Sequence, residues 1–184
     1  MRAGAILWLT GLPCSGKTTL AHAIGSLVGA AEVPVEILDG DQMRMLLSKG
    51  LGFSKEDRDI NVRRIGFVAR LLDRHGVLVI AASISPYAET RGELRRLAEQ
   101  EGLAFIEVFL DASLQSLIDR DLKGLYRRAL AGDVQHFTGV SDPYEPPAHP
   151  DIVVRTDVES VAESVQRVLD ALVAREILPR AVTG

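Results

Sequence analysis

The chain has 184 residues, of which 47% are hydrophobic and 25% are charged, and these values exclude a disordered, collagen-like or coiled-coil protein. Its net charge of −4 disfavours a general electrostatic attraction to nucleic acid or to an anionic membrane. The single cysteine, Cys14, excludes an intrachain disulfide, and the lack of a signal peptide or of a bilayer-spanning run of about 20 apolar residues leads us to expect a cytoplasmic protein.

Short apolar runs alternate with longer amphipathic stretches along the chain. Apolar runs of this length are typical of strands buried on both faces of a parallel sheet. In chain order, we expect a strand at 5–10, a helix at 17–27, a strand at 35–38, a helix at 54–74, a strand at 77–82, a helix at 87–101, a strand at 105–110, a helix at 114–121, a strand at 152–154 and a helix at 158–174. The alternation predicts an α/β, doubly wound fold in one domain over residues 1–184.

The stretch 121–151 interrupts this alternation. It contains no clear strand, and four of the eight prolines of the chain fall within it, at positions 143, 146, 147 and 150. A segment of this length without regular structure is usually a lid, a binding loop or a linker. A linker is disfavoured because the sheet pattern resumes afterwards.

A phosphate-binding motif follows the first expected strand and opens the first expected helix. The residues from Gly11 to Thr18 fit the pattern G-x-x-x-x-G-K-[ST]. The glycines let the backbone turn around an anion, so that successive N–H groups and the positive end of the helix dipole converge on phosphates. Lys17 is placed to reach the β- and γ-phosphates, and the Thr18 hydroxyl can ligate Mg²⁺.

This motif predicts that a nucleoside triphosphate binds with Mg²⁺. The residues expected to contact the nucleotide are Gly11, Leu12, Pro13, Cys14, Ser15, Gly16, Lys17, Thr18 and Thr19. Cys14 has two interpretations, a redox switch at a helix N-terminus or a small residue at a variable position of the motif, and we favour the second.

Two carboxylates, Asp39 and Asp41, follow the second expected strand. Ligands in a doubly wound sheet bind beyond the carboxyl ends of the strands, so these acids are expected near the phosphate loop. One can act as the base for a substrate hydroxyl, and either can help to hold Mg²⁺. Arg44 can then take a substrate anion. The alternative is an aspartate that caps a helix, followed by a solvated arginine.

Two further groups of polar residues could bind substrate. Arg58, Asn61 and Arg64 share one face of the helix expected at 54–74, which suits a phosphate or sulfate ester, although a charged surface stripe is the alternative. Ser85 follows the third strand, where it could bind substrate or accept phosphate. Ser85 also fits a helix N-cap, with Pro86 at the first helical position.

Seven segments in a fixed order resemble one family, the adenylyl-sulfate kinases, over about residues 5 to 175. Besides the phosphate loop, they are Asp39-Gly40-Asp41-x-x-Arg44, Gly52-Phe53-Ser54-x-Glu56-Asp57-Arg58, Asn61-x-Arg63-Arg64-Ile65-Gly66, Ile84-Ser85-Pro86-Tyr87, Lys123-Gly124-Leu125-Tyr126 and Phe137-Thr138-Gly139-Val140 with Pro143-Tyr144-Glu145. The phosphate loop alone indicates only a nucleoside triphosphate, whereas the ordered set is specific.

The resemblance implies a P-loop kinase with a three-layer fold, a parallel five-stranded sheet and a lid over 121–151. Such a kinase transfers the γ-phosphoryl group of ATP to the 3′-hydroxyl of adenosine 5′-phosphosulfate. The product is 3′-phosphoadenylyl sulfate, an intermediate of sulfate assimilation. The family is commonly homodimeric, and the resemblance implies a functional link to ATP sulfurylase. These properties are expectations for this chain, with no nucleic acid or membrane as a partner.

The resemblance also implies roles for particular residues. The expected catalytic residues are Lys17, Asp39, Asp41 and Ser85, the last at a position for which a phosphoserine has been proposed in the family. The expected acceptor-binding residues are Asp41, Arg44, Phe53, Arg58, Asn61, Ile84, Ser85, Lys123 and Phe137. Among these, Phe53 and Phe137 would sandwich the adenine of the acceptor. Arg127 and Arg128 are candidates to meet the transferred phosphate.

The sequence departs from the family pattern in three places, and two alternative functions stay open. The departures are Pro13-Cys14-Ser15 within the loop, Ala88 where arginine is usual and Leu122 where proline is common. One alternative is another small P-loop kinase, for example of nucleosides, gluconate or shikimate. The other is a catalytically inactive nucleotide-binding partner of a sulfurylase, against which the intact Lys17, Thr18, Asp39 and Asp41 argue.

Overall fold

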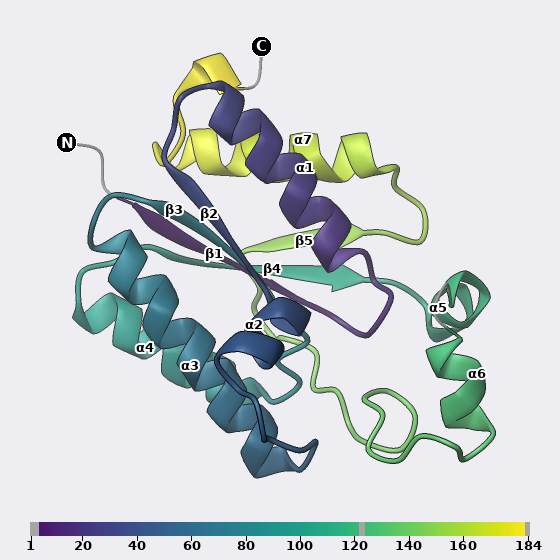
Figure 1. Cartoon of the computed structure of the whole chain (residues 1–184). Helices are drawn as coiled ribbons and strands as arrows, with labels where there is room; N and C mark the ends of the chain where they lie inside the picture. The colour runs from purple at the N-terminus through teal and green to yellow at the C-terminus, as the bar shows by residue number, and fades with distance from the viewer. Residues whose placement is uncertain (1–3, 122–123, 183–184) are drawn as a thin grey trace.

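A computed structural model describes residues 4–121 and 124–182 of the chain. It contains one parallel sheet with the strand order β2-β3-β1-β4-β5 (Figure 1). The strands are β1 (Ala5–Thr10), β2 (Val35–Asp39), β3 (Leu78–Ala82), β4 (Phe105–Asp111) and β5 (Ile152–Arg155). The helices are α1 (Lys17–Ala30), α2 (Gly40–Leu46), α3 (Lys55–Asp73), α4 (Ala88–Gln100), α5 (Leu114–Arg120), α6 (Leu125–Leu130), α7 (Val161–Ala174) and the 3-10 turn η1 (Arg180–Val182).

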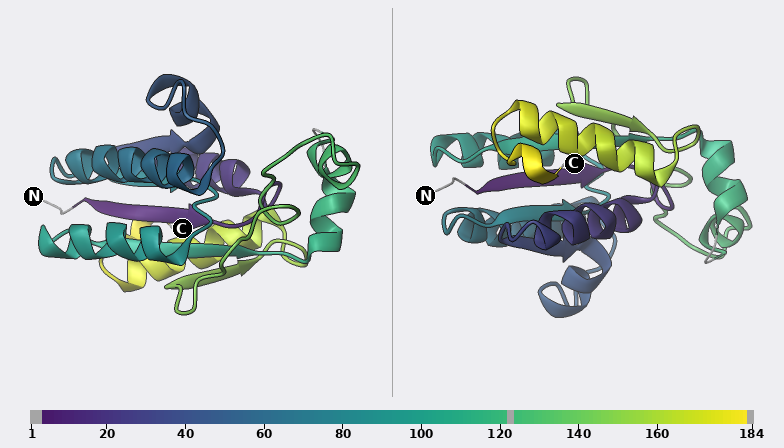
Figure 2. Two further views of the ribbon diagram at one scale, coloured as in Figure 1. Left: turned by 90° about the horizontal axis from the view of Figure 1, so that it is seen from below. Right: turned by 90° about the horizontal axis from the view of Figure 1, so that it is seen from above.

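The sheet is the middle of three layers. Helices α1 and α7 cover one face, and α3 and α4 cover the other (Figures 1 and 2). Alternate residues of a strand point to opposite faces, so β1 contributes Leu7 and Leu9 to the core under α1 and α7, and Ile6 and Trp8 to the core under α3 and α4. The central strands β1, β3 and β4 are buried at nearly every position, which explains their continuous apolar runs, whereas the edge strands β2 and β5 are partly exposed. The parallel sheet between two helical layers confirms the predicted α/β fold.

Helix α6 was not predicted, and helix α2 was predicted only as the alternative in which an aspartate caps a helix, an alternative that the Asp39 cap confirms. Helix α2 begins at Gly40 because the Asp39 carboxylate accepts hydrogen bonds from the backbone N–H groups of Asp41 and Gln42, yet none of its residues is buried. Without a buried face, α2 leaves no periodic apolar pattern in the sequence. Helix α6 lies within 121–151, where we expected no regular structure, so that expectation was wrong for Leu125–Leu130.

Helix α6 and the loop after it belong to the segment 121–151, which we call the lid, and they lie beyond the carboxyl ends of β1 and β4 (Figure 2). The end of the segment runs back along the sheet, where Asp151 bonds to the backbone of Glu107 in β4. Among the described residues of the lid, Tyr126, Ala129 and Phe137 form a small apolar cluster with Leu117 of α5. The Tyr126 hydroxyl donates a hydrogen bond of 3.1 Å to the carbonyl of Pro13, so the lid is attached to the phosphate loop. No helix among residues 4–121 and 124–182 is long and apolar enough to cross a bilayer.

The buried carboxyl of Asp73, at the end of α3, leads us to predict that the stability of the fold depends on pH. The Asp73 side chain is buried and its Oδ2 atom has no hydrogen-bond partner. Burial, and then the charge of Glu101, raise the pKa of Asp73 to about 6. The folded state therefore binds the Asp73 proton more tightly than the unfolded state does. This difference stabilises the folded protein fully below about pH 4, and the stabilisation is lost as the pH rises through 6.

We therefore expect Asp73→Asn to raise the free energy of unfolding at pH 7.5 by about 1–2 kcal/mol and to change it little at pH 4. Urea unfolding at both pH values measures the difference, with the exposed Asp133→Asn as the control. An equal effect of Asp73→Asn at the two pH values would contradict the assignment.

Candidate functional site

The phosphate loop joins β1 to α1, as the motif predicted. Gly16 precedes α1 with a φ of 92°, a left-handed conformation that favours glycine. The Lys17 side chain folds back over the loop, where its Nζ atom donates to the carbonyls of Gly11 (2.9 Å) and Leu12 (2.7 Å) and to the Ser15 hydroxyl (3.2 Å). The loop therefore surrounds an ammonium group at the start of a helix, which is an arrangement suited to an anion.

Burial lowers the pKa of Lys17 to about 8, against the opposing influence of Cys14, Asp41 and Asp39. The ammonium is thus held in the fold at a cost in free energy, because the folded state favours its neutral form relative to water. A bound polyanion would restore the charged form. Cys14 lies in the same loop with a φ of 62°.

The end of β2 meets the start of α1. The Thr18 hydroxyl donates a hydrogen bond of 2.7 Å to Oδ2 of Asp39, while Oδ1 of Asp39 caps α2. A Cβ atom on Gly40 would lie 2.8 Å from the carbonyl of Ala82, so only glycine allows this turn to approach the end of β3. The structure therefore brings together the acid and the hydroxyl that the sequence placed 21 positions apart. Asp41 lies exposed in the first turn of α2.

The Thr18 and Asp39 oxygens fit a Mg²⁺ ion. Mg²⁺ is usually held by one or two protein oxygens together with substrate phosphates and water. Within the described ranges, no group of three or more His, Cys, Asp or Glu residues forms a metal site that the protein alone could complete. A Mg²⁺ ion here would therefore depend on phosphate oxygens, as an ion that arrives with a nucleotide does.

Arg44, Phe53 and Arg58 meet beside α2. The Arg44 guanidinium lies 4.5 Å from the centre of the Phe53 ring, and the Arg58 guanidinium lies 5.6 Å from it. Burial, and then the charge of Arg58, lower the pKa of Arg44. Phe53 leaves 53% of its surface exposed. Two cations that face one exposed aromatic ring can bind an anion attached to a flat ring.

Arg58 also holds the lid. Its Nη1 atom donates to the Thr138 hydroxyl at 2.9 Å, and its Nη2 atom lies 3.3 Å from the Asp142 carboxylate and donates to the carbonyl of His136. One turn further along α3, Asn61 is buried and its Oδ1 atom has no hydrogen-bond partner. A buried acceptor without a partner is costly in free energy unless a ligand satisfies it, so Asn61 stays a candidate for acceptor binding.

Phe137 lies inside the lid. It is 9% exposed, and its ring makes an edge-to-face contact with Tyr126 at 5.0 Å between centroids. The structure therefore shows one of the two expected aromatic residues, Phe53, with an exposed face. Lys123 lies outside the described residues.

Ser85 does not cap a helix, so that expectation was wrong. Helix α4 begins at Ala88, and Tyr87 is its N-cap residue. Ser85 has a φ of 40° and is 2% exposed. Its hydroxyl accepts a hydrogen bond of 2.9 Å from the Trp8 indole and donates one of 3.2 Å to the carbonyl of Ser83. The buried Trp8 indole holds the Ser85 hydroxyl in the core. To cap α4, this hydroxyl would instead have to accept a hydrogen bond from a backbone N–H group in the first turn of that helix.

An open surface hollow of about 440 Å³ lies where Leu12 of the phosphate loop meets residues 139–146 of the lid. It is lined by Leu12 and by Gly139, Val140, Ser141, Asp142, Pro143, Tyr144 and Pro146. The sequence analysis missed Tyr144, whose hydroxyl lies 3.0 Å from that of Thr10 at the end of β1. Tyr144 stands in the Pro143-Tyr144-Glu145 segment, which was the only signal for it.

Known proteins resemble this chain over nearly its full length. The family model described as adenylylsulphate kinase matches residues 3–155. A protein of Myxococcus xanthus (strain DK1622) named adenylyl-sulfate kinase is 58% identical over 99% of this chain and 98% of its own length. A solved APS kinase of Mycobacterium tuberculosis in complex with AMPPNP and APS is 41% identical, covers 94% of this chain and 99% of that one, and has a TM-score of 0.90.

A gluconokinase of Sinorhizobium meliloti 1021 is 20% identical with a TM-score of 0.61, so it shares the fold alone. The gluconate and shikimate alternatives therefore gain no support beyond the fold. From the family model and from its identity to these kinases over nearly its full length, the chain belongs to the adenylylsulphate kinase family and is a phosphotransferase.

Proposed function

We propose that this chain transfers the γ-phosphoryl group of ATP to the 3′-hydroxyl of adenosine 5′-phosphosulfate, with Mg²⁺. The observation that carries the proposal is the contact between Thr18 and Asp39. Because this contact joins Asp39 to the start of α1, directly after the phosphate loop, a substrate hydroxyl bound beside α2 would lie next to the transferred phosphate. The M. tuberculosis relative, solved with AMPPNP and APS, supports this choice of substrates.

The residues of the site divide the reaction between them. The loop 11–16 and Lys17 hold the β- and γ-phosphates, with Thr19 beside them. Thr18 and Asp39 hold Mg²⁺, which would neutralise charge on the phosphates. Asp41 accepts the proton of the 3′-hydroxyl while the new oxygen–phosphorus bond forms and the bond between the γ-phosphorus and the β–γ bridging oxygen breaks. We assign this proton to Asp41 because the proposal gives Asp39 to Mg²⁺ and because Oδ1 of Asp39 caps α2.

The acceptor lies between α2 and α3 in this proposal. Arg44 and Arg58 bind the phosphosulfate of this substrate, and Phe53 stacks on its adenine. Asn61 offers it a hydrogen-bond acceptor, the Oδ1 atom that has no partner within the protein. The backbone of Ile84 and Ser85 completes the site together with Lys123 and Phe137. Arg58 connects the acceptor to the lid, whose closure excludes the water that would otherwise hydrolyse ATP. Arg127 and Arg128, exposed on α6, are the lid cations that meet the transferred phosphate.

The test is phosphorylation of adenosine 5′-phosphosulfate by the purified full chain with Mg-ATP. Formation of 3′-phosphoadenylyl sulfate, with no phosphorylation of gluconate, shikimate or nucleosides, supports the proposal. Tight binding of both substrates without product would instead favour an inactive nucleotide-binding partner.

Phe53→Ala should weaken acceptor binding and leave ATP binding unchanged. Stacking of a base on an aromatic ring contributes about 1–3 kcal/mol, so we expect the KM for adenosine 5′-phosphosulfate to rise about 10-fold or more. Steady-state kinetics with each substrate varied in turn measures this, and Phe53→Trp, which keeps a flat ring, is the matched control. An equal rise of the KM for ATP would refute the stacking role.

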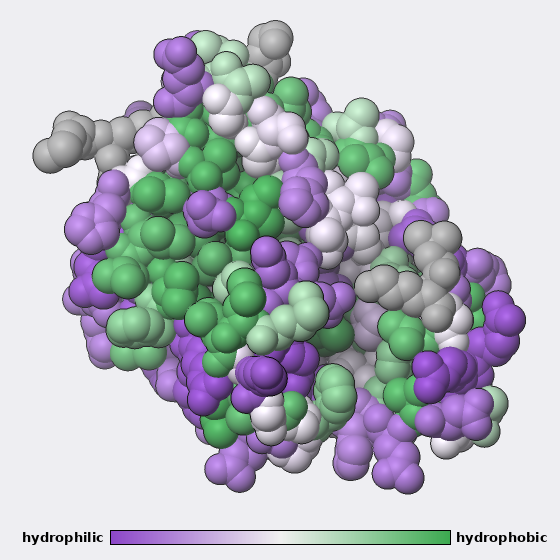
Figure 3. All heavy atoms as spheres, viewed as in Figure 1, coloured by the Kyte–Doolittle hydropathy of each residue, from purple (hydrophilic) through white to green (hydrophobic). Residues whose placement is uncertain are grey.

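We further propose that the chain forms a homodimer through an exposed apolar surface. Met45, Leu46 and Leu47 at the end of α2, and Phe67 and Leu71 on α3, are large hydrophobic residues exposed by 40% or more. Hydrophobic residues gather over α3 and the neighbouring β2 edge (Figure 3). A second copy of the chain is a natural partner for this surface, because it is present wherever the chain itself is present. Sedimentation equilibrium, which measures the mass of the particle in solution, tests for the dimer.

In this proposal, residues 1–184 form one kinase domain. The protein acts in the cytoplasm and is functionally linked to ATP sulfurylase. The proposal assigns neither nucleic acid nor membrane as a partner, in keeping with the net charge of −4.

A further inference from the structure

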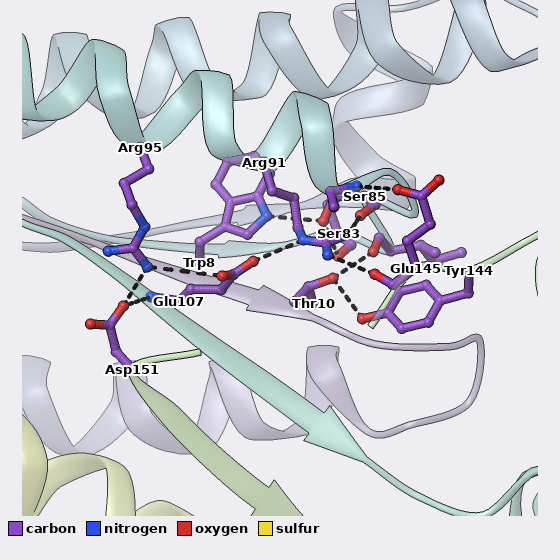
Figure 4. Close-up of polar contacts among 12 residues, drawn as sticks. Trp8, Thr10, Ser83, Ser85, Arg91, Arg95, Glu107, Tyr144, Glu145 and Asp151 are labelled. Atoms are coloured by element: carbon purple, nitrogen blue, oxygen red, sulfur yellow. Dashed lines mark hydrogen bonds and ion pairs between the residues drawn. The ribbon is translucent and has the colours of Figure 1, made fainter. Parts of the chain in front are cut away.

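A buried ion pair lies between α4 and β4, outside the residues that the proposed reaction uses. The Nε atom of Arg91 donates a hydrogen bond of 2.8 Å to Oε1 of Glu107 (Figure 4). Arg91 is 3% exposed and Glu107 is 7% exposed. Glu107 stands in the middle of β4, where its register partner on β1 is Trp8. The pair therefore occupies the interior of the three-layer core.

Such a pair is weak evidence for stability, because the desolvation of two charges offsets most of their attraction, and well-packed apolar residues often serve as well. This pair is distinguished by the hydrogen bonds of the other two guanidinium nitrogens, Nη1 and Nη2 of Arg91. The Nη1 atom donates 2.6 Å to the carbonyl of Ser85, and the Nη2 atom donates 2.6 Å to the carbonyl of Glu145. Because the guanidinium is a rigid planar fork, the three acceptors are held in one geometry.

These two carbonyls belong to segments that are far apart in the sequence. Ser85 lies in the loop 83–87 between β3 and α4, which we call the acceptor loop. Glu145 lies in the segment 143–145, which we call the lid return. One direct hydrogen bond also joins them, from the Glu145 N–H to the carbonyl of Pro86 (2.8 Å). The Glu145 carboxylate accepts a second one (2.7 Å) from the N–H of Ala88, the first residue of α4.

The acceptor loop is held in an uncommon conformation. Ser85 has a φ of 40°, which costs free energy for a residue with a Cβ atom and persists only where surrounding contacts impose it. The contacts that impose it are the Trp8 indole on its hydroxyl and Arg91 on its carbonyl. The Thr10 hydroxyl donates to the carbonyl of Ile84 (2.8 Å) and contacts the hydroxyl of Tyr144, so a second link joins the loop to the lid return (Figure 4).

We propose that Arg91, anchored by Glu107, is a positioning residue for the phosphoryl transfer. It acts through the Ser85 and Glu145 carbonyls, sets the acceptor loop against the substrate and ties that loop to the lid return, without itself touching either substrate. The part about substrate rests on the proposed function, whereas the structural link does not.

The experiment compares Arg91→Lys with Arg95→Lys in the full chain. Lysine keeps the charge next to Glu107 but cannot hold three acceptors in one plane. Arg95, one turn along α4, is the matched control because it shares the anchor but not the loops: it lies 3.9 Å from Oε2 of Glu107 and binds Asp151 (2.5 Å) and the carbonyl of Phe105 (3.2 Å), and it contacts neither the acceptor loop nor the lid return. We expect Arg91→Lys to raise the KM for adenosine 5′-phosphosulfate about 10-fold with the KM for ATP within threefold, and Arg95→Lys to change neither beyond twofold.

Trp8, the single tryptophan, gives a readout that is independent of activity. Its indole N–H donates to Ser85, so its ¹H–¹⁵N cross-peak reports the position of the acceptor loop. Arg91→Lys should shift this cross-peak and speed amide hydrogen exchange of Ala88 and Glu145, while Arg95→Lys leaves both unchanged. An unshifted cross-peak with unchanged KM values in folded Arg91→Lys would overturn the proposal.

Glu145→Ala keeps the proposal testable if Arg91→Lys does not fold. Glu145 is exposed, and this change removes only the carboxylate that binds Ala88. It should raise the acceptor KM in the same direction and speed exchange of the Ala88 amide, and no change in either contradicts the link. A wild-type chain that phosphorylates no acceptor overturns the proposed function instead, and the cross-peak and exchange results then still decide the structural link.

Discussion

Replacing Lys17 with alanine is expected to abolish turnover. The Nζ atom lies at the centre of the phosphate loop, and its charge is the group best placed to stabilise the β- and γ-phosphates during transfer. Removing one electrostatic stabiliser of this kind lowers kcat by about 10²–10³-fold, and the loss of ATP affinity adds to it, so kcat/KM for ATP should fall at least about 10³-fold.

The fold should survive this substitution. Because burial lowers the pKa of Lys17 to about 8, the charged side chain is held at a cost in free energy, and its removal should not lower the melting temperature. The exposed Lys49→Ala is the control, for which we expect activity within twofold of wild type. Unchanged kinetics in a folded Lys17→Ala protein would show that ATP does not bind at this loop.

The second large effect is expected from Asp41→Asn. Asparagine keeps the shape of the side chain but cannot take up the proton of the acceptor hydroxyl, so kcat should fall about 10²–10⁴-fold while the KM for ATP changes little. The matched comparison is Asp39→Asn. Asparagine is a good N-cap residue, so α2 should persist, but the weaker oxygen ligand should raise the Mg²⁺ concentration needed for half-maximal activity.

The two variants decide which carboxylate is the base. A near-normal kcat for Asp41→Asn, combined with an inactive Asp39→Asn at saturating Mg²⁺, would reverse our assignment. Circular dichroism of both variants checks that the short α2 helix remains.

Much of the fold could be predicted because its signals are local. The strands of a parallel sheet are buried on both faces and are therefore continuous apolar runs, and the phosphate loop consists of consecutive residues. Helix α2 was predicted only as an alternative, from its aspartate cap, because it buries no residue, and α6 was missed because six residues are too few to show a period. The contact of Thr18 with Asp39 could be expected in outline, since both follow strands of one sheet edge.

Other features depend on contacts between distant residues. Arg58 has the pattern of an anion-binding residue, yet in this structure it also binds the lid, about 80 positions away. Ser85 has the pattern of a helix cap, yet its hydroxyl is bonded to Trp8, and its carbonyl to Arg91. Nothing in the sequence near Arg91 or Glu107 indicated that they form a pair.

Composition, periodicity and motif order thus determined the α/β class, the phosphate loop and the family that the chain resembles. The tertiary structure decided which carboxylate caps α2, which serine hydroxyl is withdrawn into the core and which arginine joins the acceptor loop to the lid. The physical reason is that a strand, a helix or a loop of N–H groups arises from neighbouring residues, whereas a buried polar side chain takes its partners from whichever segments the fold brings within hydrogen-bond distance.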